Sequence, residues 1–223
     1  MHQGKSTQNK IKLRAVVFDY GNVLCHPQQP SDVEGMAAIC GLPVPRFQEL
    51  YWKFRMAYDR ADLNDDTYWN AVAREAGIAV SPSQIERLVP LDAKSWSRPN
   101  HASVQWVEQL RGAGLSLAVL SNMPIGISRY LMAHCDWFSF FHHLIFSCDV
   151  GRVKPEPEIY NHCLEKLDAV PAEVLFLDDI AKNVNGATSL GIHGLLFDTF
   201  ENTISRVGGQ FDLPMPQAYS GRL

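Results

Sequence analysis

The chain has 223 residues, of which 46% are hydrophobic, so it can form one large domain or a core with a modest insertion. Its net charge of −4 gives no general attraction to nucleic acid or to an anionic membrane, and no apolar run approaches the roughly 20 residues of a membrane-spanning helix. Five scattered cysteines without CxxC spacing favour free thiols in a reducing compartment. These features predict a cytoplasmic globular protein.

Short apolar runs with strand character recur along the chain and alternate with helical patterns. The expected strands are Leu13–Phe18, Leu115–Leu120, Leu144–Phe146, Val174–Leu177 and Gly194–Phe197. The expected helices between them are His101–Arg111, Ile127–Ala133, Glu156–Lys166 and Ala181–Leu190. Nearly continuous apolar strands separated by helices are typical of a parallel sheet that is covered on both faces. The pattern therefore predicts an α/β fold in three layers.

The first two expected strands lie too far apart for a single crossover helix. Residues 30–98 between them contain no convincing strand and show helical periodicity, in the stretches Val33–Cys40, Arg46–Tyr58, Thr67–Ala76 and Ser83–Leu88. We therefore expect an α/β core, formed by residues 12–29 and 99–208, with a helical cap at residues 30–98. Residues 1–11 and 209–223 are expected to be tails. The first lacks the apolar segment of a signal peptide, and the second is expected to run along the surface.

Four groups of chemically capable residues stand at or just beyond the ends of expected strands. They are Asp19, the pair Ser121–Asn122, Lys154 and the pair Asp178–Asp179. Each has an ordinary reading as a turn residue, a helix cap or a solvated lysine. Because ligands of open parallel sheets bind beyond the carboxyl ends of the strands, the joint occurrence of all four favours one common site.

The segments AVVFDYGNVL, LAVLSN, GRVKPEPEIY and VLFLDDIAKNVNGA together resemble the four motifs of the haloacid dehalogenase-like superfamily. The resemblance runs from about residue 13 to 200, and it implies a Rossmann-like core with an inserted cap. Four segments are similar to those of the branch that contains small sugar-phosphate phosphatases and the phosphatase domain of soluble epoxide hydrolases. They are FDYGNVL, YDRADLNDDTYW, LSNMP and LDDIAKNVNGA.

The resemblance implies a role for each group. Asp19 would attack phosphorus and form an aspartyl-phosphate. Mg²⁺ would be held by the Asp19 carboxylate, the Gly21 carbonyl and Asp179, with Asp178 acting through a bound water.

Ser121 and the amide of Asn122 would bind the phosphoryl oxygens in the implied site. Lys154 would neutralise charge on the nucleophile and the phosphoryl group. Asn183 would steady the acidic loop.

One position departs from the pattern. Phosphatases of the superfamily usually carry an acid/base aspartate where this chain has Gly21, so protonation of the leaving group is in doubt. His26 is one candidate replacement, because an imidazole titrates near neutrality, and the alternative is an ordinary loop histidine. In the cap, Arg55 or Arg60 either reaches the substrate or belongs to a solvated face.

The leading hypothesis is a Mg²⁺-dependent hydrolase of a small phosphate ester, acting as a monomer or weak homodimer. Without a general acid, activated esters such as sugar 1-phosphates become the most attractive substrates. A 2-haloacid dehalogenase is the first alternative, although the acid pair Asp178–Asp179 argues against it because displacement of halide needs no metal. The second alternative is a phosphatase-shaped protein that has lost its activity and binds a partner.

Overall fold

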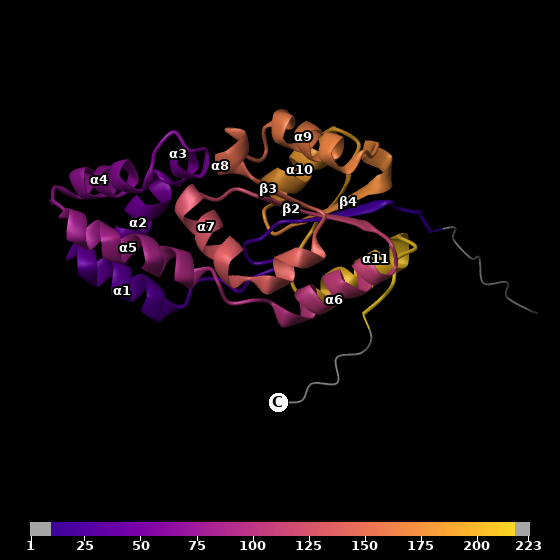
Figure 1. The fold of residues 1–223 in the computed structure, drawn as a ribbon, viewed down its shortest axis with the longest axis horizontal. Helices are drawn as coiled ribbons and strands as arrows, with labels where there is room; N and C mark the ends of the chain where they lie inside the picture. The colour runs from indigo at the N-terminus through magenta and orange to yellow at the C-terminus, as the bar shows by residue number, and fades with distance from the viewer. Residues whose placement is uncertain (1–9, 217–223) are drawn as a thin grey trace, which may run out of the picture.

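The computed structural model describes residues 10–216, and the expected tails lie partly outside this range. A five-stranded parallel sheet forms its centre (Figure 1), with strands β1 (Ala15–Phe18), β2 (Ser116–Ser121), β3 (His143–Phe146), β4 (Val174–Asp178) and β5 (His193–Leu196). The strand order is β3-β2-β1-β4-β5, so the first strand in the sequence occupies the middle of the sheet. The expected α/β fold is confirmed, and each expected strand differs from the observed one by one or two residues at an end.

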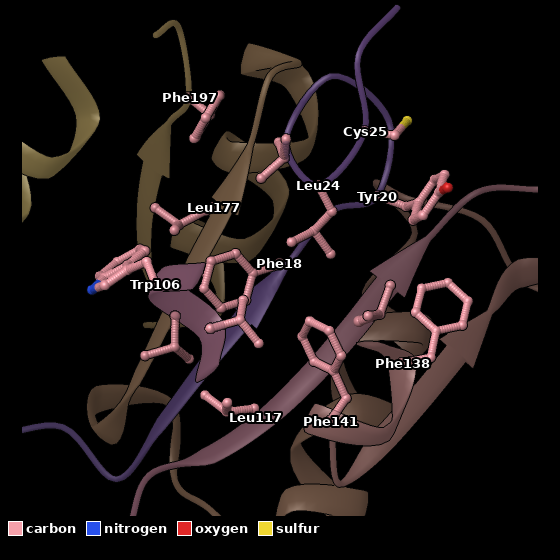
Figure 2. Packing of buried hydrophobic residues seen from close by; sticks show 14 of the residues in the cluster. Phe18, Tyr20, Leu24, Cys25, Trp106, Leu117, Phe138, Phe141, Leu177 and Phe197 are labelled. Atoms are coloured by element: carbon pink, nitrogen blue, oxygen red, sulfur yellow. The ribbon is translucent and has the colours of Figure 1, made fainter. Parts of the chain in front are cut away.

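Alternate residues of the strands face two separate layers of helices. Val16 and Phe18 point to a core shared with helices α6 (His101–Gly112), α7 (Ile125–His134) and α11 (Phe200–Gln210). Figure 2 shows Phe18 in this core with Trp106, Leu117, Phe141 and Leu177 around it. The rings of Phe18 and Trp106 meet edge to face, with their centroids 5.7 Å apart. Because both faces of the sheet are buried, its strands are continuous apolar runs in the sequence.

The opposite face of the sheet carries Ala15 and Val17 and is covered by α9 (Pro157–Leu167) and α10 (Ala181–Ser189). Three short elements complete the core: the 3₁₀ turns η1 (Asp136–Phe140) and η2 (Pro171–Glu173), and the single turn α8 (Ser147–Val150). Figure 1 shows α9 and α10 on one side of the sheet and α6 and α11 on the other. The three layers are therefore helix, sheet and helix.

Five helices form a separate cap beside the sheet (Figure 1): α1 (Pro30–Cys40), α2 (Val44–Lys53), α3 (Arg55–Asp59), α4 (Asp65–Ala76) and α5 (Pro82–Ser95). They enclose a hydrophobic cluster of their own, which includes Met36, Leu50 and Trp69. The expected single helix Arg46–Tyr58 is wrong. Phe54, with φ −102° and ψ 0°, separates α2 from α3, so the last turn takes a new direction.

The two chain segments that join cap and core lie against each other. Cys25 and Pro99 form an antiparallel bridge, the His26 amide donates to the Arg98 carbonyl at 2.8 Å, and the Asn100 amide donates to the Leu24 carbonyl at 2.8 Å. This pairing holds both connections together at one point, which is the place where a cap could hinge.

The end of the chain contributes to the core more than the sequence indicated. Helix α11 was not expected, and it extends past the assumed boundary at residue 208. Phe211 and Leu213 are buried in the same core as Phe18, and the Trp106 indole donates to the Pro214 carbonyl at 2.8 Å. The surface position expected from residue 209 onward is therefore wrong for these residues. All five cysteines are free thiols. Nowhere in residues 10–216 is a helix both long and apolar enough to cross a membrane.

Candidate active site

The sheet brings the candidate residues together at the carboxyl ends of its three central strands. Asp19 directly follows β1, Ser121 is the last residue of β2, and Asp178 is the last residue of β4. β1 pairs with β2 on one side and with β4 on the other. From β1 the chain continues to β2 and β3 on one side of the sheet, whereas β4 and β5 lie on the other side. Ligands of such folds bind in the crevice at this reversal of strand order.

Lys154 lies between two buried carboxylates. Its Nζ is 2.7 Å from Asp19 Oδ1 and 2.6 Å from Asp178 Oδ2, and its side chain is only 1% exposed. Burial by itself lowers the pKa of Lys154, but the two carboxylates outweigh burial and raise the pKa above its ordinary value. Burial raises the pKa of Asp19 to about 7, and the Lys154 ammonium opposes that rise. The lysine thus favours the ionised form of the Asp19 carboxyl.

Hydrogen bonds hold the Asp178 carboxylate from several sides. The Ile180 amide donates to its Oδ1 at 2.8 Å, and Asn183 Nδ2 lies 3.1 Å from both oxygens. With Lys154 bound as well, Asp178 has little capacity left for a direct metal ligand. The position expected for Asp178, with a water between it and the metal, stays a prediction, and Asn183 contacts the acidic loop directly through Asp178.

Asp179 turns toward the same crevice. One carboxylate oxygen from each of Asp19, Asp178 and Asp179 lies within 4.8 Å of the other two. Asn22 donates from Nδ2 to Asp179 Oδ2 at 2.8 Å, and the left-handed backbone of Asn22, with φ 57°, is one that asparagine tolerates. Three carboxylates face one ammonium group, so negative charge is in excess and the hard oxygen donors fit a divalent cation such as Mg²⁺.

The Asn122 side chain holds the segment that carries Lys154. Its Nδ2 donates to the Lys154 carbonyl at 3.0 Å, and its Oδ1 accepts from the Lys154 amide at 2.8 Å. The Asn122 carboxamide is therefore bonded within the protein at both of its polar atoms. Ser121 is 4% exposed and lines the crevice beside it.

A cavity of about 310 Å³ lies between these residues and the cap. Its lining includes the sheet-end residues Asp19, Gly21, Asn22, Ser121, Asn122, Lys154, Asp179 and Asn183. Arg55 and Asp59 enter from the cap, together with several apolar side chains. Arg55 lies at the cavity, but its Nε donates to Asp59 Oδ1 at 2.8 Å and its Nη1 to Asp92 Oδ2 at 3.1 Å and to the Tyr51 hydroxyl. Its main contacts thus lie within the cap.

Two other candidates lie outside the cavity lining. His26 is exposed, and Arg60 forms an ion pair with Glu156 across the boundary of cap and core. At Gly21, a Cβ atom would meet only Trp96 Cζ3, at 3.9 Å, so the position has room for a side chain that this chain lacks. The structure thus offers no support for His26 as a replacement acid.

The sequence analysis missed several residues of the site. Ser147 joins the two parts of the molecule, because its Oγ accepts from the Met123 amide at 2.9 Å and donates to the Asp59 carbonyl at 2.5 Å. Asn22 had a local signal, since it lies in the FDYGNVL loop, three residues after Asp19. Asp59 and the apolar cap residues had none, because their proximity to Asp19 depends on how the cap folds.

Comparison with known proteins identifies the family. The model of haloacid dehalogenase-like hydrolases matches residues 13–191. The chain belongs to the haloacid dehalogenase-like hydrolases. It is 31% identical over 183 residues to sesquiterpene phosphatase astK of Aspergillus oryzae, a match that covers 82% of this chain and 88% of the relative. It is also 34% identical to mouse bifunctional epoxide hydrolase 2, over 56% of this chain but only 24% of that relative's length.

Solved structures confirm the fold. The HAD family enzyme bt-2542 of Bacteroides thetaiotaomicron, in complex with magnesium and inorganic phosphate, superposes with a TM-score of 0.68 at 19% identity. The match covers 85% of this chain and 98% of that enzyme. Haloacid dehalogenases share the fold as well, so the fold alone does not choose between the two reactions. The family match makes the chain a haloacid dehalogenase-like hydrolase, and its relatives include proteins named phosphatases.

Proposed function

We propose that the protein is a Mg²⁺-dependent phosphomonoester hydrolase that acts on a small phosphorylated metabolite. The observation that carries the proposal is the buried contact of Lys154 with Asp19 and Asp178, beside a third carboxylate. The three carboxylates exceed the one ammonium by two negative charges, which a divalent cation would balance. The cation and Lys154 would then offer positive charge to a phosphate group. A dehalogenase needs no metal ion, so nothing would neutralise the surplus carboxylates there. The surplus therefore favours phosphate chemistry.

In the proposed reaction, an Asp19 oxygen attacks phosphorus and the bond from phosphorus to the leaving oxygen breaks. The resulting aspartyl-phosphate is then hydrolysed by water, which releases inorganic phosphate and restores the Asp19 carboxylate. Lys154, Ser121 and the Asn122 amide would bind the phosphoryl oxygens. Mg²⁺, held by Asp19, Asp179 and the Gly21 carbonyl, would supply further neutralisation of the phosphoryl charge.

The glycine at position 21 limits the leaving groups that can depart. A positioned general acid typically contributes about 10² to 10⁴-fold, and the position that usually carries it in the superfamily's phosphatases is Gly21 here. We therefore expect kcat/KM to fall steeply as the pKa of the leaving group rises. Anomeric phosphates, such as sugar 1-phosphates, and aryl phosphates should outrank simple alkyl phosphates of similar size. Gly21→Asp should flatten this dependence, because the position has room for a side chain.

The proposal is tested by phosphate release from 4-nitrophenyl phosphate, with and without Mg²⁺, beside halide release from 2-chloropropionate. We expect phosphate release that chelation abolishes and no halide release. Halide release without metal would favour a dehalogenase. Absence of both activities would favour a binding protein that has lost its chemistry together with the second aspartate.

A further inference from the structure

The cavity has two chemically different parts. The sheet ends contribute the carboxylates, the lysine, the serine and the amides that surround the site of phosphate attack. The cap contributes Trp52 from the end of α2, Met56 from α3 and Trp96 from the end of α5. Met123 and Ile127 of the core lie in the same lining. With the phosphate held at the sheet ends, the leaving group must extend along this apolar wall.

Several of the polar atoms near the wall are already bonded within the protein. Of the polar side chains that the cap contributes to the lining, Arg55 and Asp59 bind each other at 2.8 Å. The Tyr20 hydroxyl donates to the Trp96 carbonyl at 2.7 Å, and the Trp96 indole N–H lies 3.3 Å from the Tyr51 hydroxyl. The hydroxyls of a sugar would therefore find few partners here, and hydroxyls that are buried without partners are costly.

Exposed apolar side chains concentrate at the same place. Of the nine large hydrophobic side chains that are exposed among the described residues, three line this cavity: Trp52 at 54%, Met56 at 47% and Ile180 at 51%. Trp52 also meets Trp96 edge to face, with ring centroids 6.3 Å apart. Contiguous exposed apolar surface beside a polar site is typical of a ligand-binding surface.

We propose that the preferred substrates are phosphate monoesters of apolar alcohols or phenols, with an aliphatic or aryl leaving group rather than a sugar. This inference rests on the proposed function, because it assumes that phosphate binds at Asp19 and Lys154. Gly21 favours leaving groups of low pKa, and at a given leaving-group pKa the apolar wall favours those without hydroxyls. Apolar surface of the leaving group is transferred from water to Trp52, Met56 and Trp96.

The first experiment measures kcat/KM with Mg²⁺ for n-alkyl phosphates from ethyl to octyl, and for glucose 6-phosphate. All have primary alkoxide leaving groups, so leaving-group chemistry is nearly constant while apolar surface changes. We expect kcat/KM to rise by up to about fourfold per methylene until the cavity is filled, and octyl phosphate to exceed glucose 6-phosphate at least about tenfold. A flat series, or a preference for the sugar phosphate, would overturn the inference while leaving the phosphatase assignment intact.

A second measurement does not depend on turnover. Calorimetric titration of the Mg²⁺-loaded protein with alkylphosphonates, which are not hydrolysed, should show affinity rising with chain length by a similar factor. If phosphate release fails for every ester but this trend is present, the proposed reaction is wrong and the apolar ligand class stands. If affinity is independent of chain length, the ligand class is wrong.

Substitutions locate the effect. Met56→Gln keeps the length of a half-exposed side chain, so folding should not suffer, and it should lower kcat/KM for octyl phosphate at least about threefold more than for ethyl phosphate. Met132→Gln is the matched control, because Met132 is 56% exposed on α7 and lies outside the cavity lining. It should leave both values unchanged. If both variants change the ratio of octyl to ethyl phosphate kcat/KM equally, the chain-length effect does not arise at Met56.

Discussion

The core and the cap each bury one cation between two carboxylates, yet they lead to different chemistry. In the core, Lys154 lies between Asp19 and Asp178. In the cap, Arg55 lies between Asp59 and Asp92, with ion-pair distances of 2.8 Å and 3.1 Å. The core cluster has a third carboxylate, so its carboxylates outnumber its one ammonium by two. The cap cluster also reaches the cavity, through Arg55 and Asp59, but it has only two carboxylates, and the Tyr51 hydroxyl donates to one of them, Asp92, at 2.6 Å. We therefore propose that a similar ionic motif is a reactive site in one region and a structural joint in the other.

The largest difference should appear when the nucleophile is removed. Asp19→Asn should lower turnover of 4-nitrophenyl phosphate by at least about 10⁴-fold, because the carboxylate that attacks phosphorus is lost. Chemical denaturation should show that the variant remains folded. Asp198→Asn, which changes an exposed aspartate in an ion pair with Arg206, is the control and should keep full activity. Appreciable turnover by Asp19→Asn would show that another group attacks phosphorus.

Loss of Arg55 and loss of Lys154 should differ in whether Mg²⁺ restores stability. Arg55→Met leaves two buried carboxylates without their partner, and we expect the free energy of unfolding to fall by about 3 to 5 kcal/mol. Lys154→Met should destabilise the core in the same way, but Mg²⁺ should restore part of that loss, because its carboxylates face a cation site. Urea titrations of both variants and of the wild type, with and without Mg²⁺, measure this difference.

Arg206→Met is the control for Arg55→Met, because it makes the same substitution at an exposed arginine. Arg206 is 37% exposed, and its removal should change stability by less than about 1 kcal/mol. If Mg²⁺ stabilises Arg55→Met as much as Lys154→Met, the assignment of the cation site to the core cluster alone is wrong.

Within the core cluster, Asp178 and Asp179 should respond differently to metal. Asp178→Asn removes an outer partner and should raise the Mg²⁺ concentration required for half-maximal activity by about 10 to 100-fold. Asp179→Asn should raise it further, because Asp179 is the proposed direct ligand. Activity measured across a Mg²⁺ titration gives both values. Coincident curves would contradict the separate roles of the two neighbours.

The smallest effect concerns the pH dependence of stability in the cap. Burial raises the pKa of Asp59 to about 6, although Arg55 opposes the rise. The folded state therefore binds the Asp59 proton more tightly than the unfolded chain does. Protonation of Asp59 stabilises the folded state below about pH 4, and this contribution is lost as the pH rises to about 6. Asp59→Asn lacks this titration. The stability of the wild type relative to the variant should therefore decrease between pH 4.5 and 7, by on the order of 1 kcal/mol. An increase over this range would mean that ion pairing dominates burial.

Much of the site was predictable because its residues follow strands. Asp19 and Asp178 stand at the ends of apolar runs that enter one parallel sheet, and the ends of such strands necessarily meet at one edge. The roles of Arg55 and Asp59 were not predictable in the same way. The break at Phe54 has no proline or glycine to signal it, and the partner Asp92 lies far along the chain.

The sequence by itself determined the α/β class, the helical insertion and the convergence of Asp19, Lys154 and the acidic pair. These follow from local patterns, because strand and helix periodicity and the direction of parallel strands need no knowledge of distant contacts. Only the tertiary structure decided the wall opposite the acids, where Trp96 comes within 3.9 Å of the Cβ position of Gly21. It also decided that Phe211 and Leu213 belong to the core. Both depend on packing between segments that are remote in sequence, and packing is selected by shape and burial rather than by any local pattern.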